Sequence, residues 1–257
     1  MNSNNRIIYL NTPCSVSMAD DWYDYGTMDH FWVRHRNAVF DRHFGDIICA
    51  SQFIGEIGCG NGLMLSYIAS RYQKAADGFE LNLSALELCP TIPGTLYVYD
   101  ILSKNPDLVQ KYDLIMLIDV IEHIEDETPF LLAAREHLKP GGLLIIGVPM
   151  RQHLFSAYDV AAGHYRRYST RNLKSLVQNS GFEVKKIVQW GHLYIPLLML
   201  RKYMLAGAKK EDVIRKGFGS SSVINTCLSP LRYLDFIPTF GITGTSSFLL
   251  AQKLNDV

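Results

Sequence analysis

The feature that most constrains the fold is a short apolar run followed by glycines at every second position. The apolar run covers residues 53–57, and the glycines are Gly58, Gly60 and Gly62. Glycine has no side chain to hold a ligand away from the backbone, and it accepts the positive φ of tight turns. A helical pattern starts directly afterwards, at Leu63. The sequence therefore predicts a strand that turns sharply beneath a bound ligand and enters a helix.

Further apolar segments predict a sheet built from the same strand-and-helix unit. The predicted strands after the glycine turn cover residues 75–81, 95–99, 112–118, 143–148, 182–189 and 247–253. Helical patterns such as residues 63–71 and 129–138 separate strands that follow each other along the chain. Parallel strands need such crossovers, which cover both faces of the sheet. We therefore expect a doubly wound, mostly parallel α/β sheet of seven strands.

Acidic residues stand at the ends of three predicted strands. They are Glu80, Asp100 and Asp119. In an open α/β sheet, ligands bind at the carboxyl ends of the strands, where the strand order reverses. We therefore expect these carboxylates to surround the glycine turn.

The chain is expected to have four parts. They are an N-terminal arm and helical lid (1–50), an α/β core (51–194), a helical insertion (195–245) and the last strand of the core (246–257). The lid pattern runs over residues 27–48, and Gly45 predicts a break in its helix. The insertion has apolar helical patterns at 195–208 and 223–236. Four readings of it stay open: a cover over the sheet edge, a wall of a binding pocket, a homodimer contact, or a peripheral membrane contact.

Composition excludes several classes of function. Lys plus Arg and Asp plus Glu both number 25, so no net positive charge attracts nucleic acid. The five cysteines are widely spaced and include no CxxC pair, which argues against a disulfide framework. The N-terminus is polar, and the apolar region 193–206 is too short to span a bilayer. We expect a cytoplasmic protein without a transmembrane segment.

Four motifs in order resemble one known family. They are Glu56 to Gly62 (EIGCGNG), Gly78 to Glu80 (GFE), Asp119 to Ile124 (DVIEHI) and Leu138 to Gly142 (LKPGG). A GxGxxG dinucleotide fingerprint would need glycine at position 63, where the chain has leucine. Over residues 53–189 the chain resembles the class I S-adenosylmethionine-dependent methyltransferases, which have a Rossmann-like fold. A nicotinamide-dependent oxidoreductase and a non-catalytic binding module are the weaker alternatives.

The resemblance implies a set of residues that bind S-adenosyl-L-methionine. They are Glu56, Gly58, Cys59, Gly60, Asn61, Gly62, Glu80, Leu81, Asp100, Ile101, Asp119 and Val120. Glu80 would accept hydrogen bonds from the ribose hydroxyls, and Asp100 would receive the adenine amino group. Carboxylates suit a ligand that presents mainly donors. The competing reading is that Glu80 or Asp100 caps the next helix.

A second resemblance concerns the methyl acceptor. Residues 163–169 (GHYRRYS), with residues 29–36, resemble a subgroup of bacterial small-molecule methyltransferases. Trp32, Tyr165, Arg166 and Arg167 are the candidate acceptor-binding residues, since adjacent arginines can hold a carboxylate or phosphate. The competing reading pairs one arginine with an acidic residue. The expected acceptor is a small molecule of hydrophobic or aromatic character, methylated on oxygen or nitrogen. A lipid-linked or sugar acceptor is the alternative.

His123 and His164 are the candidate catalytic bases, because imidazole titrates near neutral pH. A structural role for His123 is the competing reading. The spacing of Asp119, Glu122 and His123 is similar to the ExxEH metal motif of small-RNA 2′-O-methyltransferases and some ubiquinone-pathway O-methyltransferases, with His164 as a fourth ligand. Asp119 stands where those enzymes have glutamate. We therefore expect no metal.

Overall fold

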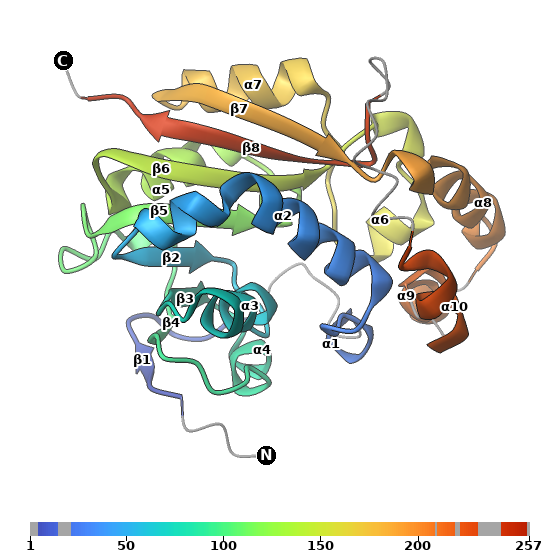
Figure 1. Ribbon diagram of the computed structural model, residues 1–257, viewed down its shortest axis with the longest axis horizontal. Helices are drawn as coiled ribbons and strands as arrows, with labels where there is room; N and C mark the ends of the chain where they lie inside the picture. The colour runs from blue at the N-terminus through green and yellow to red at the C-terminus, as the bar shows by residue number, and fades with distance from the viewer. Residues whose placement is uncertain (1–4, 15–21, 209, 219–221, 231–242, 256–257) are drawn as a thin grey trace.

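The structure is a computed structural model that describes residues 5–14, 22–208, 210–218, 222–230 and 243–255 (Figure 1). Its centre is one sheet with the strand order β1-β4-β3-β2-β5-β6-β8-β7. The strands are β1 (Ile7–Tyr9), β2 (Ile54–Ile57), β3 (Asp77–Glu80), β4 (Leu96–Val98), β5 (Tyr112–Ile118), β6 (Leu138–Pro149), β7 (Phe182–Trp190) and β8 (Ser246–Lys253). Strand β8 runs antiparallel to both of its neighbours, and the other pairs are parallel. The predicted doubly wound α/β fold is confirmed.

The sheet has one strand more than the seven predicted. The additional strand, β1, comes from the N-terminal arm and pairs in parallel with β4, so that Ile7 lies opposite Leu96. Only three residues of the arm form it. A segment this short has too few alternating positions to give a strand pattern, which is why the sequence did not predict it.

The helices cover both faces of the sheet and one of its ends. They are α1 (Trp22–Tyr25), α2 (Phe31–Ala50), α3 (Leu63–Tyr72), α4 (Leu83–Glu87), α5 (Glu127–His137), α6 (Ala157–Ala161), α7 (Thr170–Asn179), α8 (Ile195–Leu205), α9 (Lys210–Phe218) and α10 (Ser222–Leu228). The 3-10 segments are η1 (Ile101–Ser103), η2 (Ile121–His123), η3 (Gln152–Leu154) and η4 (His192–Tyr194). Helices α5 and α7 contribute to one buried apolar cluster, and α2 and α3 contribute to the other. The sheet therefore lies between two cores.

Helix α2 is continuous, so the break predicted at Gly45 is wrong. Gly45 lies against the ring of Tyr72 on α3, and a Cβ at this position would lie 3.1 Å from the Tyr72 hydroxyl. The glycine thus allows two helices to approach closely. The C-terminal half of α2 covers the sheet, and its N-terminal half extends toward α10 (Figure 1).

The insertion lies at one end of the sheet rather than along its edge. Helices α8 and α9 pack against α6, and α9 also packs against α1 (Figure 1). A third apolar cluster holds this group together, and it includes Tyr158, Leu205 and Ile214. Helix α9 was missed in the sequence because most of its residues are polar. Residues 231–236 of the second predicted helical pattern (223–236) lie outside the described residues.

Within the ranges given above, no helix is both long enough and apolar enough to cross a membrane.

Candidate active site

The glycine turn after β2 has the backbone conformation that only glycine adopts easily. Gly58, Gly60 and Gly62 all have positive φ, at 70°, 52° and 73°. A Cβ at Gly58 would lie 2.7 Å from a methyl group of Val120, and one at Gly62 would lie 2.2 Å from the sulfur of Cys89. The turn therefore packs tightly against its neighbours and begins α3 directly afterwards.

Glu80, at the end of β3, holds this turn in place. Its Oε2 accepts a hydrogen bond from the Gly60 backbone N–H at 3.1 Å. Its Oε1 accepts from the N–H groups of Leu81 and Asn82, at 2.8 and 2.9 Å. Burial raises the pKa of Glu80, and these hydrogen bonds oppose the rise. Since a carboxylate can accept about four hydrogen bonds, Oε2 keeps capacity for a ligand hydroxyl.

A cavity of about 520 Å³ opens above the turn. The predicted site residues in its lining are Trp32, Glu56, Gly58, Cys59, Gly60, Asn61, Asp119, His123, His164 and Arg167. The predicted site residues that do not belong to this lining are Gly62, Glu80, Leu81, Asp100, Ile101, Val120, Tyr165 and Arg166. The structure thus brings together the glycine turn, one end of β5 and both candidate histidines.

The floor of the cavity is acidic, and an arginine lies within it. Glu56 is 3% exposed, and its Oε2 has no hydrogen-bond partner among the described residues. Burial raises the pKa of Glu56 to about 8, although the positive charge of Arg36 opposes the rise. Arg36 donates from Nη1 to Oδ2 of Asp119 at 3.1 Å. This floor suits a ligand that carries both a cation and an anion.

Arg36 is a functional candidate that the sequence analysis missed. It lies on α2 and is buried, with 5% of its surface exposed. The distance along the chain between Arg36 and the glycine turn hides their proximity. The sequence offered one sign of this role, because Arg36 is part of residues 29–36 (DHFWVRHR). From that segment the sequence analysis chose Trp32 as the candidate binding residue.

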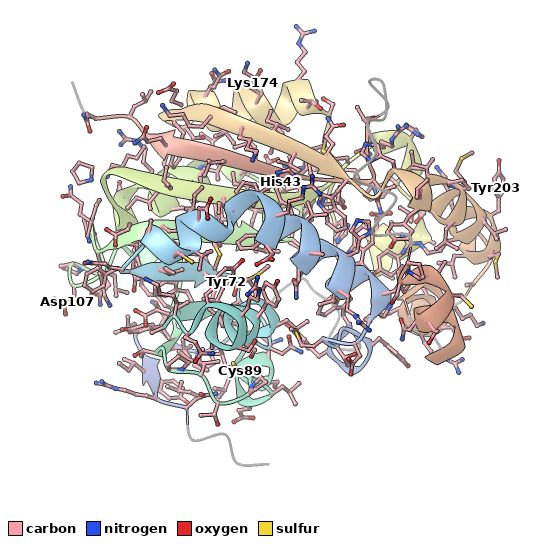
Figure 2. The ribbon with its side chains drawn as sticks, viewed as in Figure 1. His43, Tyr72, Cys89, Asp107, Lys174 and Tyr203 are labelled. Carbon is pink, nitrogen blue, oxygen red and sulfur yellow. The ribbon has the colours of Figure 1, made fainter. Side chains whose placement is uncertain are left out.

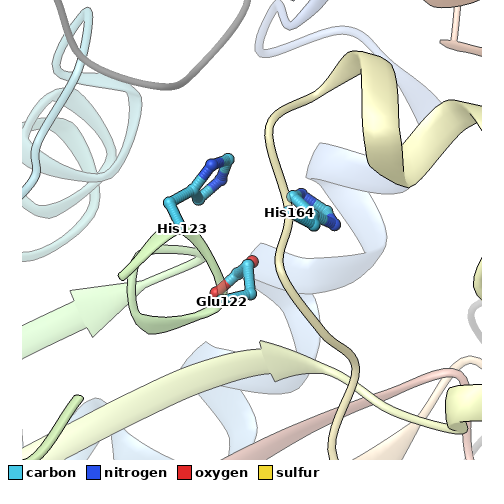
Figure 3. Close-up of side chains that lie close together, drawn as sticks. All are labelled: Glu122, His123 and His164. Carbon is cyan, nitrogen blue, oxygen red and sulfur yellow. The ribbon is translucent and has the colours of Figure 1, made fainter. Parts of the chain in front are cut away.

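Glu122, His123 and His164 form a compact cluster in the cavity wall. Figure 3 shows Glu122 and His123 on η2 and His164 on the segment that follows α6. One ligand-type atom from each side chain lies within 4.8 Å of the other two. The two imidazole rings are perpendicular, with centroids 4.7 Å apart. Burial, then the neighbouring His164, lower the pKa of His123 to about 3. His123 is therefore neutral at physiological pH.

Asp159 on α6 orients His164. Its Oδ1 lies 3.0 Å from Nδ1 of His164 and accepts a hydrogen bond from Nε of Arg167 at 2.7 Å. Its Oδ2 accepts from the backbone N–H and hydroxyl of Ser156. Burial alone would raise the pKa of Asp159, but the hydrogen bond from His164 and the charge of Arg167 hold it below its usual range. In a neutral imidazole, this ionised carboxylate favours the tautomer with the proton on Nδ1, in which Nε2 is the nitrogen that can accept or coordinate.

The acidic partners of Arg166 and Arg167 support the competing reading for both residues. Arg167 pairs with Asp159, and Arg166 forms an ion pair with Glu127 and donates to the Glu125 carbonyl at 2.8 Å. Tyr165 is half exposed. Of these predicted acceptor-binding residues, Arg167 lines the cavity, and it does so as part of the Asp159 network.

Asp100 caps a short helix, as its competing reading proposed. Its Oδ1 accepts a hydrogen bond from the Leu102 N–H at 2.9 Å, at the start of η1. The backbone N–H of Asp100 donates to Asn11 in the N-terminal arm. Its contact with an adenine amino group stays a prediction.

The rest of the cavity wall is mostly apolar, although Arg201 and Lys216 also belong to it. Trp32 packs on Trp190 with ring centroids 4.5 Å apart, and it also contacts Tyr194. The insertion supplies Leu197, Leu198, Leu200, Met204 and Leu205 to the lining. The insertion is therefore a wall of the pocket, one of the four readings that the sequence left open.

The chain was compared with known proteins. A family model described as "Methyltransferase domain" matches residues 54–187. A Mycolicibacterium smegmatis protein named "Probable S-adenosylmethionine-dependent methyltransferase" is 24% identical over 159 residues, which cover 61% of this chain and 61% of the relative. A ubiquinone biosynthesis O-methyltransferase from Chelativorans sp. is 32% identical over 113 residues, which cover 40% of this chain and 45% of the relative. The chain thus spans less than two thirds of the length of these curated relatives.

Solved structures show the same fold. A phosphoethanolamine N-methyltransferase from Haemonchus contortus, in complex with phosphomonomethylethanolamine and S-adenosylhomocysteine, superposes with a TM-score of 0.56 at 18% identity. The match covers 86% of this chain and 52% of that one. The family model spans more than half of the residues. It includes the glycine turn, β5 and the cluster of Glu122, His123 and His164. The chain belongs to the methyltransferase-domain family.

Proposed function

We propose that this protein transfers a methyl group from S-adenosylmethionine to an oxygen or nitrogen of a small molecule held in the 520 Å³ cavity. S-adenosylmethionine is the cofactor. The observation that carries the proposal is the acidic floor beneath the glycine turn, where Glu56 and Asp119 lie beside Arg36. Oε2 of Glu56 is buried without a hydrogen-bond partner among the described residues, and a ligand cation would compensate it.

The methionine end of the cofactor complements this floor. Its ammonium group would bind Glu56 and Asp119, and its carboxylate would bind Arg36, since charge-assisted hydrogen bonds of this kind are short and strong. The glycine turn leaves room for the backbone to approach the ligand. Glu80 would accept from the ribose hydroxyls through Oε2. Asp100, Ile101, Leu81 and Val120 are proposed to hold the adenosine part, as the family resemblance implies.

The acceptor is proposed to enter between the histidine cluster and the apolar wall. Methyl transfer is an in-line displacement: the acceptor atom attacks the methyl carbon, and the electron pair of the broken carbon–sulfur bond stays on sulfur. The principal demands on the protein are alignment and, for a hydroxyl acceptor, removal of a proton. His164 is the better candidate base, because Asp159 holds its ring through Nδ1. His123 stays a second candidate.

A methyl-transfer assay tests this proposal. The purified protein would be incubated with S-adenosylmethionine and a panel of phenols and amines that differ in apolar bulk. S-adenosylhomocysteine and a product heavier by one methylene group are expected for at least one class of acceptor. Failure to form S-adenosylhomocysteine with any acceptor, together with failure to bind it, would contradict the proposal.

A lipid-linked acceptor is a second candidate, and helix α8 favours it. The same helix that lines the cavity exposes Met199, Leu200, Tyr203 and Met204, with Tyr203 77% exposed. Leu200 and Met204 also belong to the cavity lining, so this exposed surface continues from the cavity. Figure 2 shows Tyr203 at the periphery of the molecule. An acceptor with a long apolar tail could follow this surface out of the cavity. A series of acceptors with increasing alkyl length distinguishes the candidates, because KM falls with tail length only for the lipid-linked class.

A further inference from the structure

The cluster of Glu122, His123 and His164 has a feature that acid–base chemistry does not explain. Glu122 is 1% exposed, and its Oε2 has no hydrogen-bond partner among the described residues. A buried, ionised carboxylate without a donor is unfavourable unless a cation compensates it or the group takes up a proton. Burial and the nearby Asp119 accordingly raise the pKa of Glu122, and a bound cation would favour its ionised form instead. The charged neighbours that act on Glu122 are Asp119, Arg167 and Asp159, and the only positive one, Arg167, already pairs with Asp159. The carboxylate therefore faces two imidazoles in the cavity wall without a cation of its own.

The arrangement around His164 is that of a metal ligand rather than a free base. A coordinating imidazole usually donates its other N–H to a carboxylate, which fixes the tautomer and the ring orientation. Asp159 performs this role for Nδ1 of His164, and Asp159 is itself held by Arg167 and Ser156. His123 is held on its side by a hydrogen bond to the Gly163 carbonyl. Each of the two rings thus has a defined orientation.

We propose that Glu122, His123 and His164 bind one divalent transition-metal ion, with open coordination positions that face the acceptor pocket. Their ligand atoms lie within 4.8 Å of one another. Metal–ligand bonds of about 2.0–2.2 Å place ligand atoms closer together than this limit, so an ion draws the three side chains slightly inward. One carboxylate and two neutral imidazoles suit Zn²⁺, Fe²⁺, Co²⁺ or Mn²⁺ better than Mg²⁺ or Ca²⁺, which prefer oxygen ligands. Asp119 is not part of this set, because its carboxylate pairs with Arg36.

This inference rests on the proposed methyl transfer. A bound ion would restrict the methyl acceptors to compounds with a hydroxyl group. A bound cation lowers the pKa of a coordinated hydroxyl. The hydroxyl proton then leaves to solvent, the oxygen attacks the methyl carbon, and the carbon–sulfur bond breaks with its electron pair on sulfur. A protonated amine would instead be repelled by the ion. With the ion bound, the imidazoles act as ligands, and this role replaces the role of base given above to His164 and His123.

Cobalt titration of the chelator-treated, full-length protein tests the proposal. Visible absorption reports the ligand type, and calorimetry reports the stoichiometry. We expect one Co²⁺ per chain, bound through nitrogen and oxygen, with Zn²⁺ in competition. Glu122→Gln and His164→Ala should each weaken binding more than tenfold, and Asp159→Asn should weaken it by roughly 10–100-fold. His153→Ala is the matched control, because this exposed histidine lies outside the cluster.

Three outcomes would overturn the proposal. They are no binding by the wild-type chain, equal binding by the cluster variants, or thiolate absorption bands, which would place the ion on the free cysteines. S-adenosylhomocysteine binding is measured on every sample. Retained S-adenosylhomocysteine binding shows that a variant is folded. This measurement also separates the metal site from the proposed methyl transfer. If the protein binds S-adenosylhomocysteine but no metal, only the metal site is contradicted. If the wild type does not bind S-adenosylhomocysteine, the proposed methyl transfer is contradicted.

Discussion

Glu56 shows how burial prepares a single residue for a charged ligand. Its carboxyl lies under the glycine turn with a pKa raised to about 8 by burial. At neutral pH most molecules of the ligand-free protein therefore hold a proton on Glu56. If the cofactor's ammonium group binds at Glu56 as proposed, it favours the ionised form, and the proton leaves on binding.

This linkage predicts a pH dependence of binding. Below the pKa of Glu56, S-adenosylhomocysteine binding should release close to one proton, and its affinity should rise as pH increases from 6 toward about 8. Calorimetry in buffers with different ionisation enthalpies counts the released protons. In Glu56→Gln the proton release should disappear. Unchanged proton release in that variant would assign the titration to another group.

His123 predicts a pH dependence of stability. Its pKa is about 3 in the folded protein and near 6.5 in the unfolded chain. Between these values the unfolded state binds more protons, so the free energy of unfolding decreases as pH falls through this window, by at most about 1.4 kcal/mol per pH unit. His123→Gln should have a flatter profile between pH 6.5 and 3 than the wild type. Denaturant unfolding of both chelator-treated proteins at several pH values measures this difference. Equal pH dependence of the free energy of unfolding in the two proteins would contradict the prediction.

At the scale of elements, the sequence predicted the strands and the glycine turn well because their patterns are local. The apolar run of β5 and the positive-φ glycines determine structure over a few residues. Contacts between distant segments were not predictable in this way. Asp159 and His164 come from one segment and Glu122 from another, and Arg36 reaches the site from α2. Ser156 and Asp159, spaced as a capping box, were the only local sign that α6 begins there.

Helix α8 offers a matched pair that tests its role as a pocket wall. Leu198 lines the cavity, whereas its neighbour Met199 is 47% exposed and does not belong to the lining. Leu198→Ala should raise KM for the acceptor several-fold, because it removes apolar contact area worth about 1–3 kcal/mol. Met199→Ala should leave KM unchanged for an acceptor without a long apolar tail. Steady-state kinetics with the acceptor found in the panel checks both, and equal effects would contradict the assignment.

At the scale of the whole molecule, the fold brings together two groups of site residues that lie far apart in the sequence. One group is the glycine turn with Glu80 and the acidic floor, next to the point where the strand order reverses between β2 and β5. The other group is the histidine cluster with the apolar wall of the insertion. The first group is the proposed cofactor site, and the second group is proposed to select the methyl acceptor.

Binding of S-adenosylhomocysteine tests the central claim most directly. Isothermal titration of the wild-type protein should give one site, and Glu80→Gln should weaken binding about tenfold or more, because a hydrogen bond to a charged group contributes about 1.5–3 kcal/mol. Glu87→Gln, an exposed glutamate on α4, is the matched control and should bind as the wild type does. Absence of binding heat in the wild type, or equal affinity in Glu80→Gln, would contradict the account of this pocket.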